Sequence, residues 1–277
     1  MDTIVQALIM GIVQGLTEFL PISSSGHLIL VPYLLGWTDS FITSLAFSVM
    51  LHLGTLVALL AYFRHDWLVL IPAGLATIRD RSFHGDHNRV LAWLIVVATI
   101  PAVIVAPILA DSIEAAIRSA GVVAITLLIG AAIMWLADRQ GAKDRTIERL
   151  TFPRALLIGC AQAIALVPGI SRSGISISTG LFVGLNRESA ARFSFLMATP
   201  ITAAAGAYET VKLIRGEAGA PIQIAPLVVG MVAALVSGFA AIHFLLRYLR
   251  TNTLAIFVIY RLVLAAVVIV SVLSLSR

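Results

Sequence analysis

The chain has 277 residues, of which 60% are hydrophobic and 12% are charged. A soluble domain of this length does not need so much apolar surface, so the composition indicates a protein that folds in a lipid bilayer. The formal net charge of +5 does not indicate a nucleic-acid partner, because the Lys and Arg residues lie mainly in loops between apolar runs. The single cysteine, Cys160, excludes an internal disulfide.

The apolar runs are long and continuous, which predicts an all-α polytopic membrane protein and excludes a transmembrane barrel of alternating strands. Six runs are long enough to cross a bilayer as helices, at about 20 residues each. These predicted transmembrane helices are residues 41–63, 88–110, 120–138, 190–211, 226–246 and 254–275.

Two further apolar regions, residues 3–36 and 155–186, are each interrupted by a short polar break that contains a proline. Neither region is long enough for two crossings at 1.5 Å per helical residue. We therefore predict two re-entrant helix-turn-helix hairpins. Irregular backbone of this kind is tolerated at membrane depth only where it is buried in protein or lines a water-filled cavity.

The loop charges predict the topology. Thirteen of the 19 Lys and Arg residues lie in loops 64–89, 139–154, 187–192 and 247–250, four lie on the opposite side, and Arg172 and Arg261 remain inside the membrane. By the positive-inside rule the four loops face the cytoplasm, so both termini lie on the outer side of the membrane. Residues 1–148 and 149–277 then form two halves with three crossings each, which insert with opposite orientation in one membrane domain.

The two hairpins are also related in sequence, at a spacing of 148 residues. Gln162 corresponds to Gln14, and Ile170-Ser171-Arg172-Ser173-Gly174 corresponds to Ile22-Ser23-Ser24-Ser25-Gly26. The acid and the histidine of the first copy, Glu18 and His27, become Leu166 and Ile175 in the second copy. Inverted repeats place binding sites near the bilayer midplane, where their broken helices meet.

The first break carries the groups that could react. Gln14 and Glu18 are four residues apart and share one helix face, which leads into Ser23, Ser24 and Ser25. Ionisable residues in hydrocarbon are costly, so Glu18 and His27 are predicted to be functional. Glu18 is a candidate base, and His27 is a candidate base, nucleophile or orienting partner. The alternative is that Glu18 only caps the serine turn.

The second break carries a cation. Arg172 either pairs with Glu18 or binds a phosphate group in a bidentate manner, helped by Ser171, Ser173 and the backbone N–H groups of the turn. Arg261 is either a second phosphate contact or a tie between helices. His52 and His243 lie alone in apolar crossings and are interpreted as packed residues. A divalent cation, Mg²⁺ or Ca²⁺, that bridges Glu18 and a diphosphate is the candidate cofactor.

The motifs Gln14-x-x-x-Glu18, Pro21-Ile22-Ser23-Ser24-Ser25-Gly26-His27 and Pro168-Gly169-Ile170-Ser171-Arg172-Ser173-Gly174 resemble those of the bacterial undecaprenyl-diphosphate phosphatase family associated with bacitracin resistance. The resemblance covers essentially the whole chain. It implies removal of the terminal phosphate of undecaprenyl diphosphate at an outward-facing site, which recycles the lipid carrier for peptidoglycan synthesis. By this resemblance, the functional residues of the family correspond to Glu18, Ser24, His27, Ser171, Arg172 and Ser173. Gln14 replaces a frequent Glu, and Ser176 replaces a usual Thr.

The mechanism predicted from these residues has Ser24 attack the terminal phosphorus, while Glu18 and His27 manage the proton and Arg172 holds the phosphate. Nucleophilic attack by His27, or by a water that Glu18 activates, stays open. The rival functions are a transporter or flippase of a prenyl phosphate and a lipid-phosphate phosphatase of the Ser-Gly-His type. The expected partners are a polyprenyl diphosphate and membrane lipid, with a homodimer as a further possibility.

Overall fold

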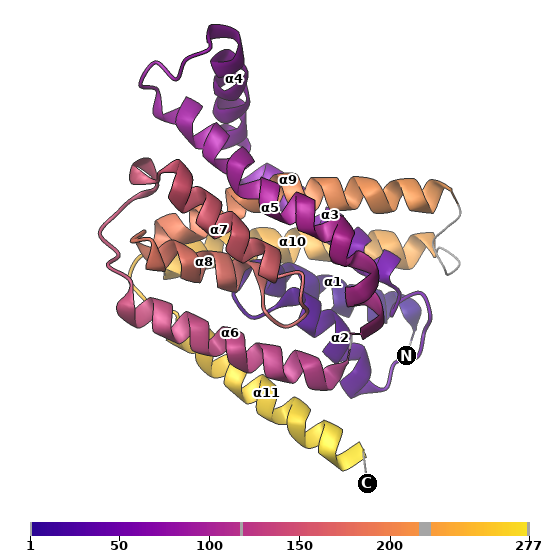
Figure 1. Cartoon of the computed structure of the whole chain (residues 1–277). Helices are drawn as coiled ribbons and strands as arrows, with labels where there is room; N and C mark the ends of the chain where they lie inside the picture. Colours follow the sequence, from indigo (N-terminus) through magenta and orange to yellow (C-terminus); the bar gives the residue numbers. More distant parts are fainter. Residues whose placement is uncertain (1, 117–118, 216–222, 276–277) are drawn as a thin grey trace.

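The structure, a computed structural model, describes residues 2–116, 119–215 and 223–275 (Figure 1). In these ranges the chain is helical, and its only β-type pairing is an isolated bridge between Arg145 and Leu185. The helices, in chain order, are α1 (Thr3–Phe19), α2 (Ser24–Leu35), α3 (Leu45–Tyr62), α4 (Arg64–Asp80), α5 (His87–Ala116), α6 (Ala120–Gln140), the 3₁₀ turn η1 (Ile147–Arg149), α7 (Phe152–Ile164), α8 (Arg172–Phe182), α9 (Arg187–Ile214), α10 (Ile224–Tyr248) and α11 (Ala255–Leu275).

Among the described residues, five helices are long and apolar enough to cross a membrane: α3, α6, α10, residues 87–106 of α5 and residues 255–274 of α11. The all-α polytopic prediction is therefore confirmed. The sixth predicted crossing, 190–211, falls inside α9, which is a helix of 28 residues but is not among these five. Most residues in the first half of α9 are buried, and the helix packs against α3, α5 and α8. A helix that contacts protein rather than lipid does not need a fully apolar surface.

The two predicted hairpins form as pairs of short helices, α1–α2 and α7–α8, and the backbone geometry of their breaks is repeated. Ser23 caps α2 at φ 76°, and Ser171 caps α8 at φ 75°. Each serine hydroxyl accepts a hydrogen bond from the glycine N–H three residues later, Gly26 or Gly174. A positive φ is unusual for a residue with a side chain, so its recurrence at equivalent positions shows that the two breaks share one design.

The pairs also pack in an equivalent way, because α1 lies along α10 and α7 lies along α5. A glycine allows each close approach. A Cβ atom on Gly11 would lie 2.2 Å from the carbonyl oxygen of Gly230, and one on Gly159 would lie 2.2 Å from that of Ala98. Gly11 and Gly159 are 148 residues apart, the spacing of the sequence repeat. The inverted orientation of the two halves in the membrane stays a prediction.

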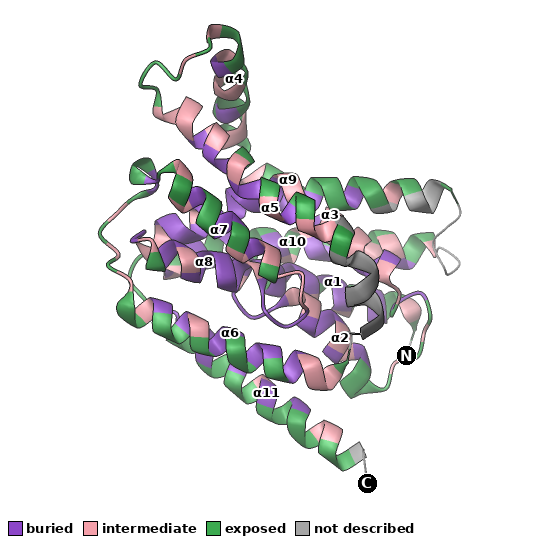
Figure 2. Cartoon of the chain, viewed as in Figure 1, coloured by how far each residue is buried: buried purple, intermediate pink, exposed green. Residues whose placement is uncertain are grey.

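Residues 64–89 do not form the hydrophilic loop that the charge pattern predicted. They contain α4, which stands out from the body of the molecule together with the start of α5 (Figure 1). Apolar residues such as Leu68, Ile71 and Leu75 are exposed along α4, and Figure 2 shows much of the helix as exposed. The prediction was wrong because it weighed the Arg residues at the ends of this segment and not the apolar run between them.

Aromatic side chains fix the end of α1 within the largest core cluster. The ring of Phe19 meets that of Phe195 of α9 edge to face at 5.4 Å, and Phe63 at the end of α3 packs on Phe195 at 6.3 Å. All three rings are almost fully buried. Because Phe19 follows Glu18 directly, this packing holds the last turn of α1 and the carboxylate that it carries.

Candidate active site

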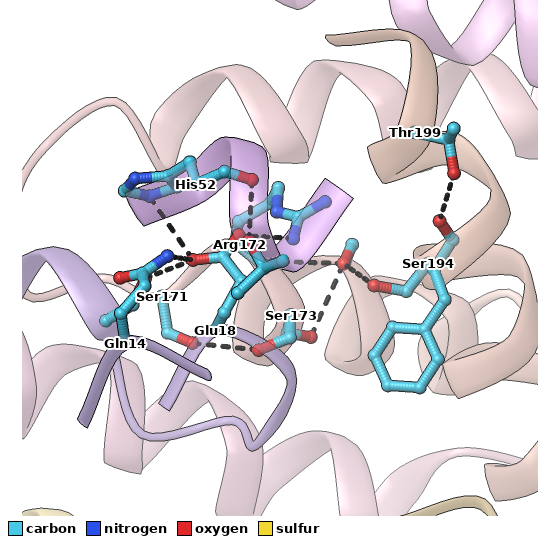
Figure 3. Close-up of polar contacts among 12 residues, drawn as sticks. Gln14, Glu18, His52, Ser171, Arg172, Ser173, Ser194 and Thr199 are labelled. Atoms are coloured by element: carbon cyan, nitrogen blue, oxygen red, sulfur yellow. Dashed lines mark hydrogen bonds and ion pairs between the residues drawn. The ribbon is translucent and has the colours of Figure 1, made fainter. Parts of the chain in front are cut away.

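Glu18 is the centre of a buried polar cluster (Figure 3). Side chains from α1, α2, α3 and α8 contribute to it. Its Oε1 accepts a hydrogen bond of 2.6 Å from Nη2 of Arg172 on α8. Its Oε2 accepts bonds of 2.5 Å from the hydroxyl of Ser24 on α2 and 3.0 Å from the amide of Gln14 on α1. The ring Nε2 of His52 on α3 lies 3.3 Å from the same oxygen. The side chain of Glu18 is only 5% exposed, so these contacts replace water around the charge.

The contact between His52 and Glu18 requires a shared proton. Nδ1 of His52 lies 2.7 Å from the carbonyl oxygen of Ser48, to which it can only donate. If the ring were neutral, its Nε2 would then turn a lone pair toward Glu18. The geometry therefore fits a proton on Nε2 or on the carboxyl group, and in either case the His52–Glu18 pair holds a proton next to Ser24.

Arg172 has one guanidinium nitrogen to spare. While Nη2 binds Glu18, Nη1 is buried and has no hydrogen-bond partner among the described residues, and the same is true of Oε1 of Gln14. A buried donor without a partner is costly, so its presence here indicates a place for a ligand. An anion that reaches Nη1 would complete the donor set of Arg172.

The reactive groups lie at two helix N-termini. Ser24 is the first residue of α2, and Arg172 is the first residue of α8. Unpaired N–H groups and the helix dipole make such ends attractive to anions. The two positive φ turns at Ser23 and Ser171 thus bring two helix starts to one place, which contains a hydroxyl, a carboxylate and a guanidinium.

A cavity of about 220 Å³ opens onto this cluster. Its polar lining comes from Glu18, Ser24, Ser25, His52, Ser171, Arg172 and Thr202, and its apolar lining from Val49, Ala165, Ile201 and Ala205. Larger hollows, of about 660 and 950 Å³, lie elsewhere on the molecule. Neither of them is lined by Glu18, Ser24 or Arg172, so size alone does not locate the reaction.

The structure does not bring His27 to Glu18. The Nδ1 of His27 lies 2.7 Å from the carbonyl oxygen of Ser23, and its Nε2 lies 2.7 Å from the hydroxyl of Tyr260 on α11. Both ring nitrogens are thus engaged, and His27 is not among the residues that line the cavity. This arrangement suits an orienting role, in which His27 fixes the turn before Ser24, better than a role as base or nucleophile.

Some of the remaining serines line the cavity, and others hold the surrounding helices and turns in place. Ser25 and Ser171 line the cavity. Ser23 caps α2, and Ser173 donates to the carbonyl oxygen of Leu20 at 3.1 Å, which joins the second break to the first. Ser176 lies 2.6 Å from the hydroxyl of Ser194 and also donates to the carbonyl of Arg172, so it fixes α8 against α9.

Arg261 is fully buried, and its guanidinium donates to five backbone carbonyls. These carbonyls belong to Pro21, Thr126, Leu127, Gly169 and Ile170. Three of them lie in the two breaks and the other two in α6, so Arg261 joins the two hairpins to α6. Of the two roles open from the sequence, this geometry favours the tie between helices, because every guanidinium nitrogen already has a partner.

The sequence interpretation missed His52 as a member of the site. A lone histidine in an apolar span is itself a functional hypothesis, because an ionisable residue there is costly. That argument singled out Glu18 and Arg172 but was not applied to His52. Within the described residues no group of three or more His, Cys, Asp or Glu side chains is arranged to hold a metal ion.

Comparisons with known proteins identify the family of the chain. Residues 7–267 match the family model described as bacitracin resistance protein BacA. An undecaprenyl-diphosphatase of Gemmatimonas aurantiaca is 46% identical over 266 residues, which are 96% of this chain and 97% of the relative. An undecaprenyl-diphosphatase of Idiomarina loihiensis is 45% identical over 263 residues, 95% of this chain and 96% of the relative. Undecaprenyl-diphosphatase 1 of Pseudoalteromonas translucida is 41% identical over 268 residues, 97% of this chain and 98% of the relative. The chain therefore belongs to the bacitracin resistance protein BacA family.

Proposed function

We propose that this protein is a membrane phosphatase that hydrolyses undecaprenyl diphosphate to undecaprenyl phosphate and inorganic phosphate. The observation that carries the proposal is the 2.5 Å hydrogen bond from Ser24 to Glu18, beside an Arg172 with a free guanidinium nitrogen. A hydroxyl, a base and a phosphate-binding cation within contact distance form a set for phosphoryl transfer. Relatives that match over almost the whole chain are named for this activity, and none of the three is named as a transporter.

In the first step Ser24 Oγ attacks the terminal phosphorus of the diphosphate. The new Oγ–P bond forms as the bond from phosphorus to the bridging oxygen breaks, and the prenyl phosphate leaves. Glu18 accepts the hydroxyl proton through the hydrogen bond that already joins the two groups. Arg172 and the N-termini of α2 and α8 stabilise the charge on the phosphate oxygens.

In the second step a water molecule attacks the phosphoserine. Glu18, which has passed the Ser24 proton to the departing prenyl phosphate, now takes a proton from this water as the water oxygen bonds to phosphorus. The bond between phosphorus and Ser24 Oγ then breaks, Glu18 returns its proton to Oγ, and inorganic phosphate is released. His52 and Gln14 hold the carboxylate in place during both steps, since each contacts its Oε2. His27 acts as a positioning residue for the Ser23–Ser24 turn, while Ser25, Ser171 and Ser173 line or support the phosphate pocket.

A divalent cation is a further part of the proposal. Glu18 is the only carboxylate that lines the cavity, and Mg²⁺ is commonly held by one or two carboxylates together with substrate phosphates. The residues therefore fit a Mg²⁺ or Ca²⁺ that arrives with the diphosphate and adds positive charge to it.

A phosphate-release assay tests the function, with the protein purified in detergent and a long-chain prenyl diphosphate as the substrate. The wild type should release phosphate, and Arg172→Ala should lower kcat/KM by about 100-fold or more. Arg139→Ala, which changes an exposed arginine that stacks on Trp135, is the control and should keep the wild-type rate. Absence of release by the wild type, or equal rates in all three proteins, would refute the phosphatase assignment.

We further propose that the protein lies in the bacterial plasma membrane with its active site open to the outer side. A Cys160→Ser background allows a test with single cysteines at Trp37, between α2 and α3, and at Arg79, near the end of α4. In intact cells an impermeant thiol reagent should label position 37 and spare position 79, and the reverse result would invert the topology. A homodimer stays a prediction, to be checked by the mass of the detergent-solubilised particle.

A further inference from the structure

A second hollow, of about 950 Å³, lies where the end of α3 meets the start of α9 and the end of α10. It is separate from the Glu18 cavity and shares none of its lining residues. Three of the loops that were predicted to face the cytoplasm, 64–89, 187–192 and 247–250, begin or end around it. The hollow is therefore at a membrane boundary, on the opposite side from the predicted outward-facing active site.

The hollow is basic. Three arginines and a histidine line it, Arg192, Arg247, Arg250 and His243, against a single carboxylate, Glu188. Arg250 pairs with Glu188 at 2.9 Å, and Arg192 pairs with Asp66. Arg247 has no ion pair or hydrogen bond to any other described residue. Because Arg250 and Arg192 are each paired with one carboxylate, Arg247 contributes one uncompensated positive charge to the lining, which favours an anionic ligand.

The lining also contains the aromatic side chains that are typical of a membrane interface: Tyr62, Phe244 and Tyr248. The rings of Phe244 and Tyr248 stack at 5.5 Å, and the hydroxyl of Tyr62 lies 3.4 Å from Nδ1 of His243. The rim of the hollow thus combines aromatic rings with hydroxyl and imidazole groups beside the arginines.

One face of α10 joins this rim to the hydrocarbon region. Val232, Val236 and Phe239 are exposed and are spaced three or four residues apart, so they form a stripe along the helix. The same spacing continues through His243 to Arg247, at the end of the helix. The stripe is thus apolar over the membrane span and becomes basic at its boundary. A ligand that follows it has an apolar chain and an anionic head.

We propose that this hollow is a binding site for an anionic glycerophospholipid, whose phosphodiester contacts Arg247 and Arg250 and whose acyl chains lie along Val232, Val236 and Phe239 of α10. Basic pockets between transmembrane helices on the cytoplasmic side are suited to such head groups, and an arginine can bind a phosphate with two hydrogen bonds. The site is independent of the proposed phosphatase reaction, since none of its residues contacts Glu18, Ser24 or Arg172 in the described structure.

Native mass spectrometry of the full-length protein in a neutral detergent tests the site. Three lipid probes are titrated: phosphatidylglycerol, phosphatidylcholine with the same acyl chains, and a prenyl monophosphate. The wild type should retain phosphatidylglycerol at least about tenfold more tightly than phosphatidylcholine. Arg247→Gln should weaken phosphatidylglycerol binding by about tenfold, the loss expected for one charge-assisted contact. Arg139→Gln, which also removes an exposed arginine near a helix end, should bind as the wild type does.

Equal binding of the two phospholipids by the wild type would overturn the site, as would equal losses in Arg247→Gln and Arg139→Gln. Retention of the prenyl monophosphate alone would overturn the assignment to a bilayer phospholipid. Phosphate release from a prenyl diphosphate in detergent should be the same in Arg247→Gln and wild type, which shows that the variant is folded. Failure of the wild type to release phosphate would count against the phosphatase and not against this lipid site.

Discussion

The two breaks have the same backbone conformation but carry different side chains. Ser23 and Ser171 adopt φ values of 76° and 75°, and each caps the helix that follows by accepting a bond from a glycine N–H. The side chains around them differ, because Glu18 in the first copy corresponds to Leu166 in the second, and Ser24 corresponds to Arg172. The comparison teaches that the repeated turn presents a helix start. In the proposed mechanism, the side chain on the first residue of that helix decides whether the helix start reacts with the phosphate or binds it.

Replacement of the first residue of each helix is the strongest way to test this division of roles. Ser24→Ala removes the proposed nucleophile and should lower kcat for a prenyl diphosphate by at least about 1,000-fold, because no other hydroxyl contacts Glu18 among the described residues. Phosphate release under single-turnover conditions is the measurement.

Ser25→Ala is the matched control for that variant. Ser25 lines the same cavity, but its described hydroxyl contact is with Ser23 at 3.4 Å and not with the carboxylate. Its kcat should stay within about tenfold of the wild type. If Ser24→Ala retained a similar rate, attack by a Glu18-activated water would replace the serine mechanism.

The two breaks share a hydrogen-bond donor, because Arg261 donates to the carbonyl of Pro21 in the first break and to those of Gly169 and Ile170 in the second. Arg261→Met leaves these buried carbonyls without their donor and should lower the free energy of unfolding by about 3 kcal/mol. Thermal unfolding in detergent measures this loss, with Arg139→Met as the control. A variant of normal stability whose KM alone is raised would instead assign Arg261 to the phosphate.

Much of this arrangement was predictable from the sequence, for a physical reason in each case. The hairpins follow from apolar runs that are too short to cross twice, and the meeting of Glu18 with Arg172 follows from the repeat and from the cost of leaving either charge unpaired in lipid. The partners of His27 and Arg261 could not be predicted, since Tyr260 and the five carbonyls lie on distant segments that only packing brings together. The helix α4 was missed because charges at its ends outweighed its apolar middle.

The role of Arg172 in the second break can be tested by a substitution that keeps its positive charge. Arg172→Lys keeps one positive charge but gives up the planar fork that lets Nη2 bind Glu18 while Nη1 stays free. We expect kcat/KM to fall by about 30-fold or more, with a higher KM as part of the change. Steady-state phosphate release measures both values.

A paired arginine outside the cavity gives the control for that charge-preserving change. Arg89 binds Asp80 at 2.9 Å near the exposed end of α4, and Arg89→Lys should leave kcat/KM unchanged. If Arg172→Lys were also fully active, a simple point charge would be sufficient, and the two-sided role of Arg172 between carboxylate and phosphate would be wrong.

The smallest expected effect concerns His52, which lies on the third helix of the first half. In the register that aligns Phe47 with Phe193, the equivalent residue on α9, the third helix of the second half, is Ala198. Of these two helices, only α3 therefore brings a titratable side chain to the site. Because the Nδ1–H group of His52 donates to the carbonyl oxygen of Ser48, Nε2 can form a hydrogen bond with Glu18 only while a proton lies between Nε2 and the carboxyl group. The rate should therefore decline as the pH rises and that proton is lost.

A glutamine at this position offers an N–H donor that does not titrate, so His52→Gln should lower kcat by about tenfold at its optimum and remove the alkaline decline. The measurement is kcat as a function of pH, with His65→Gln as a control that keeps the wild-type profile. An alkaline decline that persists in His52→Gln would show that the proton belongs to another group, and His52 would then be only a packing neighbour of Glu18.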